Sequence, residues 1–240
     1  MSGHSKWATI KRKKAIIDSK RGKAFTKLIK EITVAARVGG GDPDANPRLR
    51  TLVEKSKALN MPVDNTMRAI KKGTGELPGA SYEPFSYEGY GPHGIAVIID
   101  TLSDNKNRTV AELRHLFSVK SGSLGESGSV NWMFERMGVI QTKGEKGITE
   151  DTLLENLLDY EINDISTDED NYFSIQCNPK SLDLVKQAVE KLGLKVESAE
   201  IEWVPKTTMD LSDEQSTKAL EFLSALEDLD DVQEVYTNLA

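Results

Sequence analysis

The sequence predicts an α+β protein in which an N-terminal three-helix domain precedes two ferredoxin-like α+β domains, one inserted in the other. Three observations predict this fold class. Apolar residues first repeat with a helical period, and the period changes to that of strands after a segment rich in Gly and Pro. Residues 138–205 then run through a complete β-α-β-β-α-β order. The length of 240 residues is enough to bury more than one core.

The first part of the chain is expected to form a basic arm, residues 1–17, followed by three helices. The first helix is expected over 19–38, where apolar residues recur at i, i+3, i+4 and i+7 until three glycines end the pattern. The second helix opens with Asn46 as its N-cap and proline at its first position. The third helix is expected from about Asp64 to Gly73.

Strands are expected after the Gly- and Pro-containing segment at 74–80, which is typical of a domain boundary. Residues 82–91 and 95–102 are expected to form two strands joined by a Gly-Pro turn. A helix over 108–119 and a further strand over 130–134 should follow. The turn matches G-x-G-x-x-G, but a strand and not a helix follows it, which argues against a dinucleotide site.

The next segment is expected to alternate strands and helices, and the tail adds one of each. The elements expected in the segment are strand 139–142, helix 150–158, strands 162–167 and 172–177, helix 182–192 and strand 196–204. In the tail, Ser212 and Gln215 have the spacing of a capping box for a helix that ends near Leu229. Residues 232–237 are expected to form the last strand.

Three domains follow from this order of elements. We expect a basic arm and helical domain over 1–77, a discontinuous α+β domain over 78–134 plus 206–240, and an inserted βαββαβ domain over 135–205. The discontinuous domain is inferred because 78–134 lacks a second helix and a closing strand, and the tail supplies both.

The charge is divided unevenly along the chain. Residues 1–73 hold 18 Lys and Arg against 6 Asp and Glu, a net charge of +12, whereas the remainder carries −19. Such asymmetry indicates a polyanionic partner for the basic part. We therefore expect nucleic-acid contacts, confined to residues 1–73 because the acidic remainder repels phosphates.

The candidate nucleic-acid-binding residues are the clustered cations of this part and one aromatic residue among them. They are Lys6, Trp7, Lys11, Arg12, Lys13, Lys14, Lys20, Arg21, Lys23, Lys27, Lys30 and Arg37. The lysines and arginines would neutralise phosphates, and Trp7 could stack on a base.

Several other classes of function are not supported by the sequence. A single cysteine, Cys177, excludes an intrachain disulfide and is expected in a core, and the three histidines lack metal-ligand spacing. No catalytic grouping, cofactor site or metal site is predicted, so we expect a protein that is not an enzyme. The longest apolar run, residues 95–99, is too short to span a membrane. The short apolar stretch after the basic residues 11–14 leads us to expect no secretory signal. We expect a cytoplasmic protein.

Two loops carry weaker signals. In the segment 104–109, Asn107 or Thr109 can cap the following helix, which is favoured over an alternative in which Arg108 holds an anion. The Gly- and Ser-rich segment 122–129 lacks the ending of a phosphate-binding loop and is expected to be an irregular entry to the next strand.

Seven sequence motifs resemble those of the YebC/PmpR family, whose mitochondrial branch includes the translational activator of cytochrome c oxidase. They are MSGHSKWA from Met1, NPRLR from Asn46, NMPVDN from Asn60, RAIKKG from Arg68, YEGYGP from Tyr87, DNKNRT from Asp104 and GESGSVNWMF from Gly125. The resemblance implies a three-domain fold with a cleft, no enzymatic activity and no cofactor. His93 and Ser121 depart from the family pattern, which has glycine there, and His tolerates a positive φ poorly.

Two main hypotheses for the function remain. The resemblance favours a DNA-binding transcriptional regulator. The alternative is a ribosome-associated translation factor that binds ribosomal RNA through the basic N-terminal domain, which the absence of a clear recognition helix favours. A protein-interaction module whose acidic domains bind basic partners, or mask its own basic arm, is a third possibility.

Overall fold

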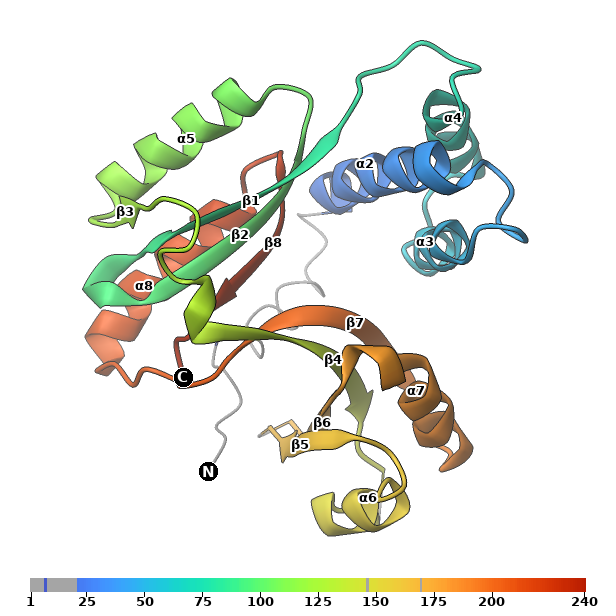
Figure 1. Ribbon diagram of the computed structural model, residues 1–240, viewed down its shortest axis with the longest axis vertical. Coiled ribbons are helices and arrows are strands. Elements are labelled where there is room, and N and C mark those ends of the chain that lie inside the picture. The colour runs from blue at the N-terminus through green and yellow to red at the C-terminus, as the bar shows by residue number, and fades with distance from the viewer. Residues whose placement is uncertain (1–6, 8–20, 146, 169) are drawn as a thin grey trace.

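The computed structural model describes residues 7, 21–145, 147–168 and 170–240 (Figure 1). It contains a helical region near the N-terminus and two antiparallel four-stranded sheets, each with its own helices. The expected mixed helix and sheet class is therefore confirmed. No helix in this described part combines the length and apolar character needed to cross a bilayer.

Three helices form the N-terminal region: α2 (Arg21–Gly39), α3 (Pro47–Ala58) and α4 (Val63–Gly73). The Asn46 side chain accepts a hydrogen bond from the Leu49 backbone N–H at 3.1 Å and caps α3 as predicted. The helices bury one shared core, in which Leu28, Ile32, Leu49, Leu52 and Ile70 take part. The charged residues of these helices lie mainly on the faces that point away from this core.

The first sheet has the strand order β3-β1-β2-β8. Its elements are β1 (Glu83–Tyr90), β2 (Ala96–Ser103), α5 (Lys106–Val119), β3 (Ser123–Leu124), α8 (Asp213–Glu227) and β8 (Val232–Thr237). Strand β8 comes from the tail and pairs with β2, so segments more than 100 residues apart share one sheet. The two helices pack on one face through an edge-to-face contact between Phe117 and Phe222, whose ring centroids are 5.0 Å apart.

The second sheet has the strand order β5-β6-β4-β7. Its elements are β4 (Phe134–Lys143), α6 (Glu150–Asn156), β5 (Ile162–Thr167), β6 (Tyr172–Cys177), α7 (Leu182–Lys191) and β7 (Val196–Pro205). The order of elements is the β-α-β-β-α-β pattern of a split unit. Cys177 is buried in the core of this sheet, as expected.

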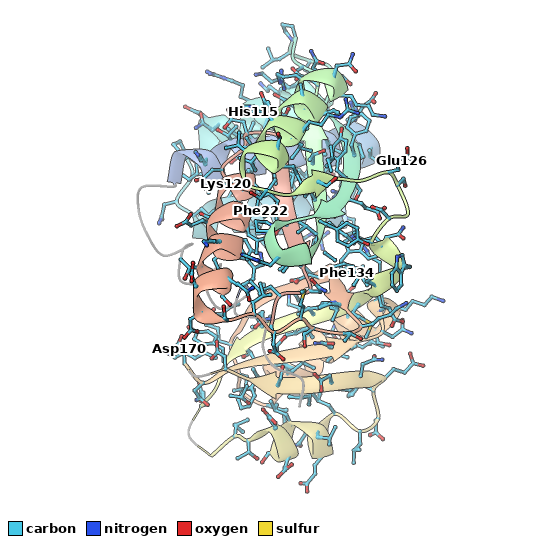
Figure 2. The ribbon with its side chains drawn as sticks, turned by 90° about the vertical axis from the view of Figure 1, so that its left-hand side faces the viewer. His115, Lys120, Glu126, Phe134, Asp170 and Phe222 are labelled. Carbon is cyan, nitrogen blue, oxygen red and sulfur yellow. The ribbon has the colours of Figure 1, made fainter. Side chains whose placement is uncertain are left out.

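Strand β2 is buried on both faces, which explains the apolar run at 95–99. Val97 and Ile99 face α5 and α8, whereas Ala96 and Ile98 face Val130, Phe134 and the second sheet. Phe134 lies at the level where the two sheets meet (Figure 2).

The sequence predicted a strand over 130–134, and this prediction is wrong. A short helix, η3 (Asn131–Met133), lies there, and β4 begins only at Phe134. The physical reason is the buried carboxylate of Glu88, which accepts the backbone N–H groups of Gly128, Val130 and Asn131, each at 2.8 Å. Those amides are then satisfied without a strand partner. The neighbouring Gly- and Ser-rich loop also contributes β3, which the sequence did not predict.

His93 and Ser121, the two residues that depart from the family motifs, both have a positive φ in the left-handed region. His93 has φ 61° in the turn before β2, and Ser121 has φ 58° after α5. Only glycine adopts this region without steric cost, so each of these residues holds a conformation in which glycine would be unstrained.

Candidate nucleic-acid interface

Six of the twelve candidate binding residues lie outside the described residues. They are Lys6, Lys11, Arg12, Lys13, Lys14 and Lys20. Arg21 is the first residue of α2, and only its backbone is described. The role expected for these seven cations stays a prediction. The structure places the other five side chains.

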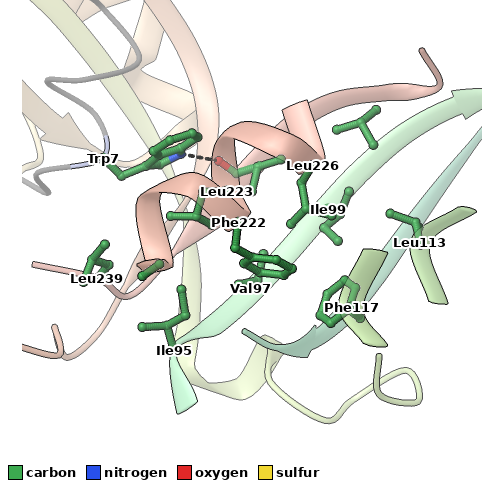
Figure 3. Close-up of a cluster of buried hydrophobic side chains, with 13 residues drawn as sticks. Trp7, Ile95, Val97, Ile99, Leu113, Phe117, Phe222, Leu223, Leu226 and Leu239 are labelled. Carbon is green, nitrogen blue, oxygen red and sulfur yellow. Dashed lines mark hydrogen bonds between the residues drawn. The ribbon is translucent and has the colours of Figure 1, made fainter. Parts of the chain in front are cut away.

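Trp7 is a core residue in this structure. Its side chain is 3% exposed and packs among the apolar residues between the first sheet and α8, near Leu223 and Val235 (Figure 3). The indole N–H donates to the Val235 carbonyl oxygen at 3.2 Å. Because both the ring and its N–H have partners within the protein, the expectation that Trp7 stacks on a base does not fit this arrangement.

Lys23 reaches the segment that joins α8 to β8, and Lys27 reaches β8 itself. The Lys23 ammonium donates to the Asp228 carbonyl oxygen at 3.0 Å and lies 3.5 Å from that residue's carboxylate. The Lys27 ammonium donates to the Gln233 carbonyl oxygen at 3.3 Å. This face of α2 is therefore turned toward the first sheet and its acidic connecting segment.

Lys30 is buried, contrary to the expectation of a cation that faces nucleic acid. Its side chain is 8% exposed, and its ammonium lies 2.7 Å from the Asp231 carboxylate. It also donates to the carbonyl oxygens of Leu102 and Asp230. A buried lysine with such a counter-ion holds α2 against the first sheet and is not available to a phosphate.

The Asp231 carboxylate lies at the centre of a polar cluster and accepts side-chain hydrogen bonds from Lys30, Ser103, Arg108 and Thr109. Burial alone would raise the pKa of its carboxyl, but hydrogen bonds from Lys30, Arg108, Thr109 and Ser103 outweigh it and hold the pKa far below the ordinary range. The Oδ2 atom accepts from Arg108 and Thr109 at 2.8 Å and from Ser103 at 2.9 Å.

The structure gives Arg108, Asn107 and Thr109 other roles than the capping and anion-binding roles predicted from the sequence. The N-cap of α5 is Asn105, whose side chain accepts from the Arg108 backbone N–H, so the capping roles expected for Asn107 and Thr109 are wrong. The Arg108 guanidinium is engaged by the carboxylates of Asp104 and Asp231, both at 2.8 Å. The predicted anion at this helix end is thus supplied by the protein itself.

Arg37, near the end of α2, makes hydrogen bonds to the segment that leads into β1. Its guanidinium donates to the Ser81 hydroxyl and to the Tyr82 carbonyl oxygen. The side chain stays exposed, and these two hydrogen bonds use only part of its five N–H donors, so a phosphate could still approach it.

Exposed cations outside the candidate set lie on α3, as Arg48 and Lys57, and on α4. Arg68, Lys71 and Lys72 are exposed and occupy i, i+3 and i+4 positions, which places them on one side of the helix. The opposite side of α4 is buried against α2. Within the described residues these three cations make no ion pair. Their spacing of three and four residues can be read directly from the sequence.

The described residues show no grouping of three or more His, Cys, Asp and Glu suited to a metal ion. The exposed side of α4 carries fixed positive charge from Arg68, Lys71 and Lys72, which suits contact with anionic groups.

Known proteins resemble the chain over its whole length. One family model, described as the TACO1/YebC protein N-terminal domain, matches residues 5–76, and another, described as the TACO1/YebC second and third domain, matches residues 82–239. A probable transcriptional regulatory protein of Chlorobaculum tepidum is 55% identical, and one of Chloroherpeton thalassium is 56% identical. Each alignment covers 100% of this chain and 95% of the relative.

A solved structure has the same fold. The crystal structure of a conserved hypothetical protein from Aquifex aeolicus is 45% identical, with a TM-score of 0.83, and the match covers 94% of this chain and 93% of that one. From these matches and the arrangement of its elements, the chain belongs to the TACO1/YebC family.

Proposed function

We propose that this protein is a non-enzymatic, nucleic-acid-binding regulator of gene expression that acts in the cytoplasm and binds duplex DNA through its helical domain. The observation that carries the proposal is the exposed cationic side of α4, formed by Arg68, Lys71 and Lys72. The names of the relatives, probable transcriptional regulatory proteins, support DNA as the target.

The charge distribution supports the helical domain as the contact region. Within α4 these three cations face a single acid, Asp64, near the first turn. Neutralising phosphates releases counterions, which supplies affinity without reading sequence. The acidic remainder of the chain repels a duplex, so we expect contacts to stay within residues 1–73, where the cations at 6–20 add to those of α4.

Duplex binding measured against salt tests this proposal. The test variant carries Arg68→Ala, Lys71→Ala and Lys72→Ala, and the matched control carries Lys180→Ala, Lys191→Ala and Lys195→Ala. The control removes the same charge from exposed positions of the second sheet's domain. Fluorescence anisotropy with a promoter-length duplex gives the slope of log K against log salt.

We expect the slope to become shallower by about 2 to 3 in the α4 variant, since each lost phosphate contact removes about 0.9. The control should keep the slope of the wild type. Equal slopes in all three proteins would show that α4 does not contact the phosphates.

A ribosomal target is the second candidate. The exposed side chains of α4 suit phosphate contacts, and phosphate contacts do not distinguish DNA from ribosomal RNA. Competition decides between them: binding to intact ribosomes that survives excess duplex DNA, and that the α4 variant loses, would favour a translation factor. Duplex binding that survives excess ribosomes and varies with sequence would favour the transcriptional role.

A further inference from the structure

A cavity of about 510 Å³ lies where the helical region and the two sheets meet. Figure 1 shows the three parts around this place: α2 and α3 on one side, β1, β2 and β8 on another, and β4 and β7 below. The lining residues that matter here are Glu31, Asp100, Arg136, Glu200, Trp203 and Gln233.

Some charged groups of the wall already have partners inside the protein. The Lys55 ammonium on α3 lies 2.5 Å from the Glu200 carboxylate on β7. The Arg136 guanidinium lies 4.9 Å from the centre of the Trp203 ring and 3.8 Å from the Asp100 carboxylate. These contacts join the helical region to the second sheet, and the second sheet to the first.

Two polar side chains of the wall have no partner among the described residues. The amide nitrogen and oxygen of Gln233 are both buried without a hydrogen bond. Glu31 makes no hydrogen bond or ion pair with any described residue. A ligand that supplies N–H donors would give partners to the Glu31 carboxylate and to the Gln233 amide oxygen.

We propose that this cavity binds a small aliphatic amine, whose ammonium group lies between the Glu31 carboxylate and the Gln233 amide oxygen. The apolar side chains of Phe85 and Leu102 line the same cavity and would contact the methylene chain of the ligand.

The electrostatics of Glu31 agree with a cationic ligand. Burial raises the pKa of the Glu31 carboxyl, and the carboxylates of Glu200 and Glu234 raise it further, although Lys55 and Arg48 oppose this. An ammonium ion placed among these carboxylates would favour their charged forms. A metal ion is a poorer fit, since the described acids do not gather into a metal-binding group, and the volume suits several non-hydrogen atoms.

Titration calorimetry with putrescine, in the absence of nucleic acid, tests the proposal. The neutral analogue 1,4-butanediol has the same carbon chain without the charge. The test variant is Glu31→Gln, and the matched control is Glu54→Gln, which removes the same charge from an exposed position of α3 outside the cavity.

We expect saturable 1:1 binding of putrescine to the wild type and to Glu54→Gln, at least tenfold weaker binding to Glu31→Gln, and no binding of the diol. Failure of the wild type to saturate would overturn the proposal. So would equal weakening in both variants, which indicates general attraction to an acidic surface.

A second variant separates binding from folding. Gln233→Met replaces the buried unpaired amide with an apolar side chain of similar size, so it should raise Tm without ligand and weaken putrescine binding. Unchanged putrescine affinity in this variant would contradict a role for the amide. None of these measurements involves DNA, so their outcome is independent of the proposed function.

Discussion

Asp231 accepts hydrogen bonds from side chains of α2, β2 and α5, which are far apart in the sequence. Its own side chain is 3% exposed, so its charge is stabilised almost wholly by these donors. Sequence patterns cannot reveal such a group, because Asp228, Asp230 and Asp231 look alike in the printed chain. Three-dimensional contacts alone separate the buried Asp231 from the partly exposed Asp228 and the exposed Asp230.

Asp231→Asn should lower the free energy of unfolding by about 3 kcal/mol or more at neutral pH, because it leaves the Lys30 ammonium buried without a counter-ion. The pKa of Asp231 is lowered by folding, so its contribution is complete above the unfolded pKa near 4 and is lost as pH falls through the folded value. Urea unfolding between pH 7 and pH 2 measures both effects.

The control for this prediction is Asp230→Asn, a neighbouring exposed carboxylate. It should change stability by less than about 0.5 kcal/mol. If the two variants lost the same stability, or if Asp231→Asn kept the acid dependence of the wild type, the buried cluster would not be the source of this stability.

At the scale of elements, hydrogen bonds from one side chain decide where β4 begins. Glu88 on β1 holds the backbone of 128–131. Val130 and Phe134 are therefore buried on either side of a short helix and not in one strand, and Trp132 is exposed. Burial raises the pKa of Glu88, but the three backbone N–H groups outweigh it and lower the pKa overall. An apolar pattern shows that a segment is buried, but it does not show which hydrogen bonds the backbone makes.

Glu88→Gln should weaken the hydrogen bonds that hold this loop. The amide has one acceptor oxygen where the carboxylate has two, and its N–H₂ group would face backbone N–H donors, with which it cannot form hydrogen bonds. We expect faster hydrogen exchange at the amides of Gly128, Val130 and Asn131, and a stability loss of about 1 to 3 kcal/mol. Glu126→Gln, an exposed change in the same loop, is the control. Unaltered exchange in Glu88→Gln would refute this account.

At the scale of the whole molecule, the pairing of β8 with β2 makes the first sheet depend on the tail. The second sheet is built entirely from the continuous segment 134–205 and has its own core. The domain boundaries expected from the sequence, with 135–205 inserted, stay a prediction, and the dependence of each part on its neighbours can be measured.

A fragment of residues 134–205 should unfold cooperatively by circular dichroism, because all four strands of its sheet are present. A fragment of 78–134 should stay unfolded, since it lacks β8 and the apolar side chains of α8. Adding the tail peptide 206–240 to that fragment should restore helix and strand signals. A folded 78–134 fragment alone would contradict this dependence.

The sequence by itself determined the class of fold, most elements, the caps at Asn46 and Ser212, and the separation of charge, because these follow from local periodicity and local hydrogen bonds. Only the tertiary structure decided which cations are free to bind a polyanion. Exposure depends on what packs against each side chain, and the contacts of Trp7 and Lys30 span about 200 residues or more. The cavity between the three parts is decided in the same way, since no local pattern brings Glu31 and Gln233 to one wall.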